Sequence, residues 1–478
     1  MIGLESKNYR QAIIKKINPK FKKSFQIPLS AQNISSNNIS NIPPEGIIIN
    51  SPGIYTFTNN IDWNPNSDES TAITINGNNI TLDLNGKKLN CLGNKLLTMG
   101  ILSILSENNT IKNGTISNFN IYSIGGYLSK NINISNLTLY GLTNKDISNN
   151  PISSLFIECD TVKICKTTIK DINALGTGIS GIVFFETNNT IISNSYIKNF
   201  KNNSGGCSGI VHILSNNAEI SNTKIENFKT GTLPNPESPG HTCIGIVPTA
   251  VDNININKCT IRNMNGSCDD AHGISLFIAK NAEVSNCLIE NIKDGIGGKG
   301  AKSTGIEVYG IKDQDSNIII CDCIARNISA INPGDKQCAG FSAAGNNIQF
   351  IRCKAENVKV YNENMIEDIT IGLGTGFGWA ADIRDEFIYP AVNTMTKYCT
   401  AKNCQVGFDQ FYYQNSDWCN VKSICNGIDV LNLNCSQRIL YCDQCSECPQ
   451  GPTYKTIQNI ASNNYINKIV VIYCNQSC

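Results

Sequence analysis

The stretch "GIVFFETNNTIISNSYIKNF" (Gly181–Phe200) decides the fold, because the chain repeats it several times with changes. "GIVHILSNNAEISNTKIENF" (Gly209–Phe228) and "GISLFIAKNAEVSNCLIENI" (Gly273–Ile292) align with it position by position. The same pattern restarts at Gly245, Gly305, Gly340 and, more loosely, Gly376. Such self-similarity indicates a repeat architecture, in which each unit stacks on its neighbours.

Each repeat holds three short segments in which apolar and polar residues alternate, with turn residues between them. Alternation with a period of two indicates β-strands, and no repeat is long enough for an additional crossover helix. The sequence therefore predicts an all-β fold, a single-stranded parallel β-helix of about a dozen coils with three short strands per coil. We expect right-handed winding, because parallel crossover connections are almost always right-handed.

Stacked coils place equivalent residues in columns at the interstrand spacing of about 4.8 Å. One predicted column is a ladder of Asn and Asp side chains, formed by Asn118, Asp171, Asn199, Asn227, Asn263, Asn291, Asn327 and Asn357. A second column holds small residues four positions earlier, namely Thr167, Ser195, Thr223, Cys259, Cys287, Cys323 and Cys353, followed more loosely by Cys404 and Cys425. Reduced cysteines fit this position as small hydrophobic residues.

The ends of the chain do not follow the coil pattern. Residues 1–40 contain a lysine-rich segment and are predicted to form an N-terminal arm or cap. The β-helix is expected to span residues 41–433, and residues 434–478 to form a cysteine-rich C-terminal cap. In this cap Cys442, Cys445 and Cys448 are spaced C-x-x-C-x-x-C.

The cap leaves two interpretations of its cysteines open. With Cys435 as a fourth thiolate, Cys442, Cys445 and Cys448 form a possible zinc site. Disulfides or free thiols are the alternative, because the spacing is not the conventional pair of C-x-x-C motifs. No other cofactor is expected.

Two N-terminal stretches carry a family resemblance. "INSPGIYTFTNNIDW" (Ile49–Trp63) leads into "ITINGNNITLDLNGKKLN" (Ile73–Asn90), and together with the repeats they resemble right-handed parallel β-helix proteins of the pectate-lyase-like superfamily. The resemblance implies the fold, but this superfamily includes lyases, hydrolases, epimerases and inert phage spikes. The Asn-rich, Cys-rich composition is also similar to that of β-helix proteins encoded by giant DNA viruses.

The composition of the chain makes some classes of binding partner and cellular location unexpected. The net charge is +1 and only 16% of residues are charged, so nucleic acid is not an expected partner. No apolar run is long enough for a membrane span, and the N-terminus lacks the pattern of a secretory signal. The 22 cysteines are unusual for a cytosolic protein. We therefore expect synthesis in the cytoplasm and incorporation into a viral particle.

The segment "CDDAHGISLF" (Cys268–Phe277) provides the candidate catalytic residues. In a polysaccharide lyase or epimerase, His272 or His241 would act as base, Asp269 or Asp270 would orient it, and Lys299, Lys302 or Arg384 would neutralise the substrate carboxylate. The segment is similar to a His-Gly-Ile rung of mannuronan epimerases, whose Asp-Pro-His-Asp signature is missing here. The alternative is a solvated turn with a partly buried histidine, since His272 occupies an ordinary repeat position.

Two functions remain open from sequence. The first is a non-catalytic structural or glycan-binding protein, exposed on a particle surface. The second is a carbohydrate-active enzyme, a lyase or epimerase more than a hydrolase, with a groove along the first sheet near residues 237–302. An outward apolar stripe is predicted to be covered by loops or by a homodimer or homotrimer contact; it contains Val183, Phe185, Val211, Ile213, Val247, Phe277 and Tyr309.

Overall fold

The computed structural model describes residues 31–432, apart from residues 35–36, 94, 96, 145–151, 176–177, 232–241, 268–269, 295–301, 311–314, 332–337, 362–373, 380–381, 385–386, 390, 411–412, 415–416 and 427. By its internal contacts the chain divides into two compact units. One contains residues 1–202 and 210–219, and the other residues 203–209 and 220–478. Strands β20 (Gly206–Ile213) and β21 (Asn216–Ser221) contain residues of both.

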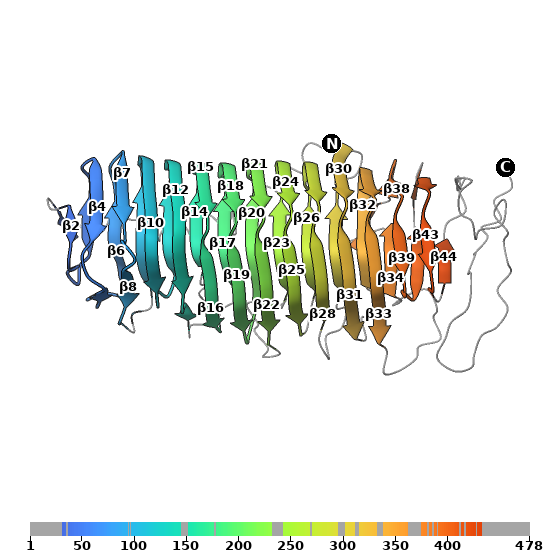
Figure 1. The fold of residues 1–478 in the computed structure, drawn as a ribbon, viewed down its shortest axis with the longest axis horizontal. Helices are drawn as coiled ribbons and strands as arrows, with labels where there is room; N and C mark the ends of the chain where they lie inside the picture. Colours follow the sequence, from blue (N-terminus) through green and yellow to red (C-terminus); the bar gives the residue numbers. More distant parts are fainter. Residues whose placement is uncertain are drawn as a thin grey trace. The chain divides into compact units, whose positions relative to one another are not determined.

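In the first unit, successive strands form three rows, and each strand pairs in parallel with its equivalents in adjacent coils (Figure 1). Row 1 consists of β1 (Gln32–Asn33), β3 (Ile47–Ile49), β6 (Glu69–Ile75), β9 (Leu97–Ile104), β11 (Tyr122–Tyr127), β14 (Ile152–Ile157) and β17 (Gly178–Phe185). Row 2 consists of β2 (Asn38–Ile39), β4 (Gly53–Phe57), β7 (Ile80–Asp83), β10 (Glu107–Ser117), β12 (Lys130–Tyr140), β15 (Asp160–Cys165) and β18 (Asn188–Ser193). Row 3 consists of β5 (Ile61–Trp63), β8 (Lys88–Cys91), the ends of β10 and β12, β13 (Thr143–Asn144), β16 (Thr168–Ala174) and β19 (Tyr196–Asn202).

The second unit repeats the same three rows. Row 1 consists of β23 (Cys243–Thr249), β26 (Ala271–Phe277), β29 (Ser303–Tyr309), the first part of β32 (Cys338–Ile351), β34 (Gly374–Trp379), β40 (Val406–Gln410) and β44 (Ile428–Asn432). Row 2 consists of β24 (Asp252–Asn257), β27 (Lys280–Ser285), β30 (Asp315–Cys321), the end of β32, β37 (Ala391–Val392), β38 (Met395–Lys397), β41 (Tyr413–Gln414) and β42 (Asp417–Cys419). Row 3 consists of β22 (Lys224–Thr230), β25 (Thr260–Gly266), β28 (Leu288–Asp294), β31 (Ile324–Ile331), β33 (Lys354–Tyr361), β39 (Thr400–Lys402) and β43 (Lys422–Ile424).

The pairing of these rows defines the class of fold. The strands of rows 1 to 3 pair in parallel, and among the described residues the one antiparallel pair is the hairpin of β35 (Asp382–Arg384) and β36 (Phe387–Tyr389). No helix occurs among the described residues. The chain is therefore a parallel β-helix, as the repeats predict. Parallel pairing already begins at β1 and β2, within the segment that the sequence assigns to the N-terminal arm.

The core is built from stacked side chains on the inward face of row 1. In the second unit Ile246, Ile274 and Ile306 lie in register, and the column continues through Phe341, Phe377 and Phe408. The three phenylalanine rings stack with centroid separations of 4.8 and 5.3 Å. Full burial of each such side chain stabilises the fold by about 1.5–3 kcal/mol, so a column of them supports the coils one after another.

Left-handed backbone positions, both within strands and between them, explain much of the abundance of asparagine. Most non-glycine residues with positive φ are asparagines, including Asn281, Asn286 and Asn291 of one coil with φ of +48°, +55° and +57°. Asparagine tolerates this left-handed conformation better than most residues, because its short side chain hydrogen-bonds locally. The same coil has a fourth left-handed position at Ile278, with φ of +57°, so asparagine is favoured at such positions but is not required.

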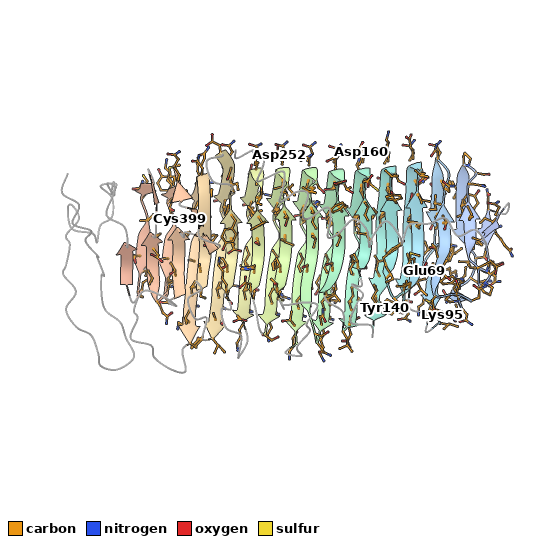
Figure 2. All side chains as sticks on the ribbon, turned by 180° about the vertical axis from the view of Figure 1, so that it is seen from behind. Glu69, Lys95, Tyr140, Asp160, Asp252 and Cys399 are labelled. Atoms are coloured by element: carbon orange, nitrogen blue, oxygen red, sulfur yellow. The ribbon has the colours of Figure 1, made fainter. Side chains whose placement is uncertain are left out.

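The cysteine column lies inside the second unit. Cys259, Cys287, Cys323 and Cys353 are buried, and their thiols donate to backbone carbonyls. The next member is Cys399, which is labelled in Figure 2, and the looser alignment to Cys404 was wrong. The backbone N–H of Thr400 donates to the Cys353 carbonyl, and this hydrogen bond places the preceding residue, Cys399, beside Cys353. All cysteines that the structure describes are free thiols.

Candidate functional site

A cluster of charged side chains lies on two neighbouring strands of row 1, β26 and β29. The register pairs Ser275 with Glu307 and Phe277 with Tyr309. Ile274 and Leu276 pack in the core, so the alternation of a strand places Ser275 and Phe277 on the outward face. The partners of these residues on β29 share that face.

Glu307 is the centre of the cluster. Its Oε2 accepts a hydrogen bond from Ser275 Oγ at 3.1 Å and lies 3.6 Å from His272 Nε2. Its Oε1 forms an ion pair with Lys302 Nζ, which also donates to the Tyr309 hydroxyl. The same ammonium lies 4.7 Å from the centre of the Tyr309 ring. Glu307 thus joins a histidine, a lysine and a hydroxyl.

Asp270 completes the cluster on the other side of His272. Its Oδ2 lies 3.7 Å from His272 Nε2, and its Oδ1 accepts a hydrogen bond from the Lys302 backbone nitrogen at 3.1 Å. His272 Nδ1 has no hydrogen-bond partner among the described residues. With His272 neutral the four ionisable groups carry a net charge of −1, and with His272 protonated they carry none.

Burial dominates the electrostatics of this cluster. His272, Glu307 and Lys302 are only 3%, 2% and 6% exposed. Burial alone would lower the pKa of Lys302, but the charges of Glu307 and Tyr309 outweigh it and hold that pKa above its usual range. Burial likewise raises the pKa of Glu307, and the charges of His272 and Lys302 outweigh it and hold that pKa below its usual range. Both groups are therefore charged at neutral pH.

The structure brings together part of the predicted catalytic set. Asp270 and His272 converge, and Lys302 joins them, although it pairs with Glu307. Asp269, His241 and Lys299 lie outside the described residues, as do the four cysteines of the possible zinc site, Cys435, Cys442, Cys445 and Cys448. No group of three or more potential metal ligands occurs in the part of the chain that is described.

Sequence reasoning missed Glu307, the residue that holds the cluster together. The available signal was a polar residue at an outward position that other repeats fill with Val183, Val211 or Val247. His212 is a different case. It takes the place of phenylalanine in the core column of the first unit, where its ring stacks on Phe184 at 4.5 Å, and it is fully buried.

A second feature lies in row 3 of the second unit. The chain forms a groove of about 510 Å³, lined by Asn227, Phe228, Lys229, Asn263, Met264, Asn265, Asn291, Lys293, Asn327 and Ser329. It does not include the residues of the Glu307 cluster. It also lies on a different row from the groove that the sequence predicted along the first sheet.

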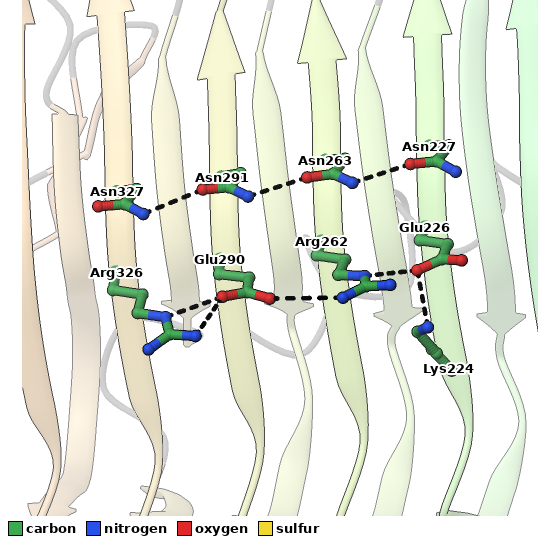
Figure 3. A network of polar contacts seen from close by, with 9 residues as sticks. All are labelled: Lys224, Glu226, Asn227, Arg262, Asn263, Glu290, Asn291, Arg326 and Asn327. Atoms are coloured by element: carbon green, nitrogen blue, oxygen red, sulfur yellow. Dashed lines mark hydrogen bonds and ion pairs between the residues drawn. The ribbon is translucent and has the colours of Figure 1, made fainter.

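The lining of the groove includes a row of asparagine amides, which Figure 3 shows. Asn263 donates to Asn227, Asn291 to Asn263 and Asn327 to Asn291, at 2.9, 2.9 and 3.0 Å. Each of these bonds uses one N–H and one oxygen lone pair, whereas an amide has two N–H donors and two lone pairs. The exposed amides of Asn263, Asn291 and Asn327 therefore each keep one N–H donor and one lone pair beyond these bonds.

A row of alternating charges runs beside the amides (Figure 3). Arg262 lies between Glu226 and Glu290, at 2.5 and 3.9 Å, and Arg326 pairs with Glu290 at 2.5 Å. Lys224 also pairs with Glu226, at 2.9 Å, so every charged side chain of this row has an ion-pair partner. In contrast, Lys229 and Lys293 on the opposite side of the amides are exposed and make no ion pair within the described part of the chain.

The predicted apolar stripe is partly covered. Val183 and Phe185 are buried, whereas Val211, Ile213, Val247, Phe277 and Tyr309 are half-buried. A dimer or trimer contact stays a prediction. Within the described residues, no helix has the length and hydropathy needed to cross a bilayer.

Comparison with known proteins identifies no family for this chain. No family model and no curated protein matches the chain. Among solved structures, it is similar to the catalytic domain of a GH87 alpha-1,3-glucanase in complex with nigerose, at 12% identity and a TM-score of 0.37, covering 84% of this chain and 66% of that one. The chain is also similar to the A-module of the mannuronan C-5 epimerase AlgE6 from Azotobacter vinelandii, at 11% identity and a TM-score of 0.35. This match covers 87% of this chain and 88% of that one.

A third similar structure is PfbA, a surface adhesin of Streptococcus pneumoniae, at 9% identity and a TM-score of 0.40, covering 81% of this chain and 86% of that one. Such distant likenesses say nothing about activity. The parallel pairing itself establishes that the chain is a parallel β-helix protein, the class that its sequence resembles.

Proposed function

We propose that this chain is a non-catalytic glycan-binding protein and that its ligand lies in the row-3 groove. The groove itself carries the proposal: it offers exposed amides at one per coil, and beside them two lysines that form no ion pair with any described residue. Sugars present hydroxyls that both donate and accept, and asparagine amides match them in both roles. A structural role on a particle surface is compatible with this function and stays a prediction.

Blocking the groove tests the proposal. We expect Asn265→Trp to weaken binding of a glycan identified from a panel of neutral and acidic polysaccharides by about tenfold or more, since the indole would fill the space between the lysines. Asn255→Trp is the matched control, because Asn255 is an exposed strand residue outside the groove lining. The measurement is calorimetry or affinity electrophoresis. Equal binding by both variants would disprove this location of the site.

The Glu307 cluster favours a second candidate function, a lyase or epimerase. A histidine, two carboxylates and a lysine lie within reach of one another, as proton abstraction next to a uronate carboxylate requires. Against catalysis stands the burial of His272 and Glu307, which leaves little of either side chain open to a substrate.

An activity screen separates the two functions. We expect the purified protein to release neither unsaturated uronate nor new reducing ends from any polysaccharide in the panel. We also expect His272→Gln to bind glycan as the parent protein does, because His272 is not part of the groove. Turnover that disappears in His272→Gln while the fold is retained would instead establish the enzyme.

A further inference from the structure

Resting on the proposed function, we propose that the groove binds a linear polyanionic glycan that lies along the stacked coils, with one sugar residue per coil. Acid groups on alternate sugars would then meet Lys229 and Lys293.

The register places lysines on every second coil. Lys229 pairs with Asn265, Asn265 with Lys293, Lys293 with Ser329, and Ser329 with Lys359. Adjacent coils are about 4.8 Å apart, so successive lysines of this column are separated by about 9.6 Å. The residues between them, Asn265 and Ser329, are polar and uncharged.

Charge pairing singles out the lysine column. On the other side of the amides, the arginines are matched by Glu226 and Glu290. Lys229, Lys293 and Lys359 are exposed and have no ion-pair partner in the part of the chain that is described. Among the described residues, the unpaired charge of this column is therefore positive and recurs with a period of two coils.

A β-1,4-linked polyuronate has the same repeat. Each sugar of such an extended chain advances by nearly the rise of one coil, and successive sugars are flipped, so that carboxylates on one edge recur every second residue. Hydroxyls between them would meet the free amide groups of Asn263, Asn291 and Asn327. Several weak exposed ion pairs on one polymer then act together.

A nucleic acid fits these residues less well. Single strands bind to proteins through a basic groove combined with aromatic side chains on which the bases stack. Among the described residues that line the groove, Phe228 is the only aromatic one, and it is buried. We therefore assign the anionic groups that would meet the lysine column to acidic sugars and not to the phosphates of a nucleic acid.

The test compares oligoglucuronates with cello-oligosaccharides of equal length, which share the β-1,4-linked glucose backbone and differ in the carboxylate. We expect the acidic series to bind about tenfold more tightly. The preference should appear once an oligomer is long enough to bridge Lys229 and Lys293, and should be lost in Lys229→Gln/Lys293→Gln. It should persist in Lys163→Gln/Lys422→Gln, which removes two exposed lysines outside the groove.

The outcomes distinguish this inference from the function on which it rests. Equal binding of both series, or a preference that survives Lys229→Gln/Lys293→Gln, overturns the inference, whereas groove binding is still judged by Asn265→Trp. Binding of single-stranded DNA as tight as that of the oligoglucuronate also overturns it. If neither series binds and no other glycan does, the proposed function fails, and the inference fails with it.

Discussion

Lys302→Met will destabilise the protein by about 3–5 kcal/mol, because it leaves the buried carboxylate of Glu307 without its cation. Removing one partner of a buried ion pair costs far more than losing an exposed pair, since the remaining charge is neither solvated nor compensated. The free energy of unfolding, measured by urea titration with circular dichroism, gives the effect directly.

Two further variants make this result interpretable. Lys302→Met/Glu307→Gln should recover most of the lost stability, because it removes the stranded charge and keeps the shape of the side chain. Lys293→Met, an exposed lysine of the same unit, should change stability by no more than about 0.5 kcal/mol. A Lys302→Met protein as stable as Lys293→Met would show that the cluster is not held by this ion pair.

The pKa shifts of the pair also set a pH window. The raised pKa of Lys302 means that its contribution is present below the usual lysine pKa of about 10.4 and is lost as the pH rises through the folded value. The lowered pKa of Glu307 means that its contribution is present above the usual value of about 4.3 and is lost as the pH falls through the folded value. Lys302→Met should therefore cost most between these limits.

His212→Phe will stabilise the first unit and reduce its sensitivity to acid. Burial lowers the pKa of His212 to about 3, and neither ring nitrogen has a hydrogen-bond partner among the described residues. In the unfolded chain this histidine binds a proton below about pH 6.5, so stability falls as the pH decreases from there toward 3. At pH 5 the free energy of unfolding is therefore about 2 kcal/mol lower than at neutral pH.

Phenylalanine fits the place of His212, because the neighbouring position of the column is already Phe184. At pH 7.5 we expect a gain of about 1–3 kcal/mol from removing buried polar atoms without partners. Between pH 7.5 and pH 5 the variant should lose about 2 kcal/mol less than the parent protein, as followed by urea unfolding at each pH. His272→Gln, which leaves His212 in place, should retain this part of the acid sensitivity. An unchanged pH dependence in His212→Phe would contradict the buried neutral histidine.

The cysteine column shows where prediction from spacing stops. Its first cysteines could be predicted from the repeats, since Cys259, Cys287 and Cys323 each lie four residues before an asparagine of the ladder. After Cys353 the repeats become irregular, and the position passes to Cys399 rather than Cys404. Hydrogen bonds between coils set the register there, and they cannot be predicted from the spacing of residues along the chain.

The sequence by itself determined the parallel β-helix, because a coil that recurs along the chain forces equivalent residues into columns, and the left-handed positions of the coils favour asparagine. Only the tertiary structure decided the sites. Glu307 lies more than thirty residues from His272 in the sequence, and the groove draws its lining from successive coils. Both depend on which outward side chains the register places side by side, and that register is set by packing between coils rather than by any local pattern.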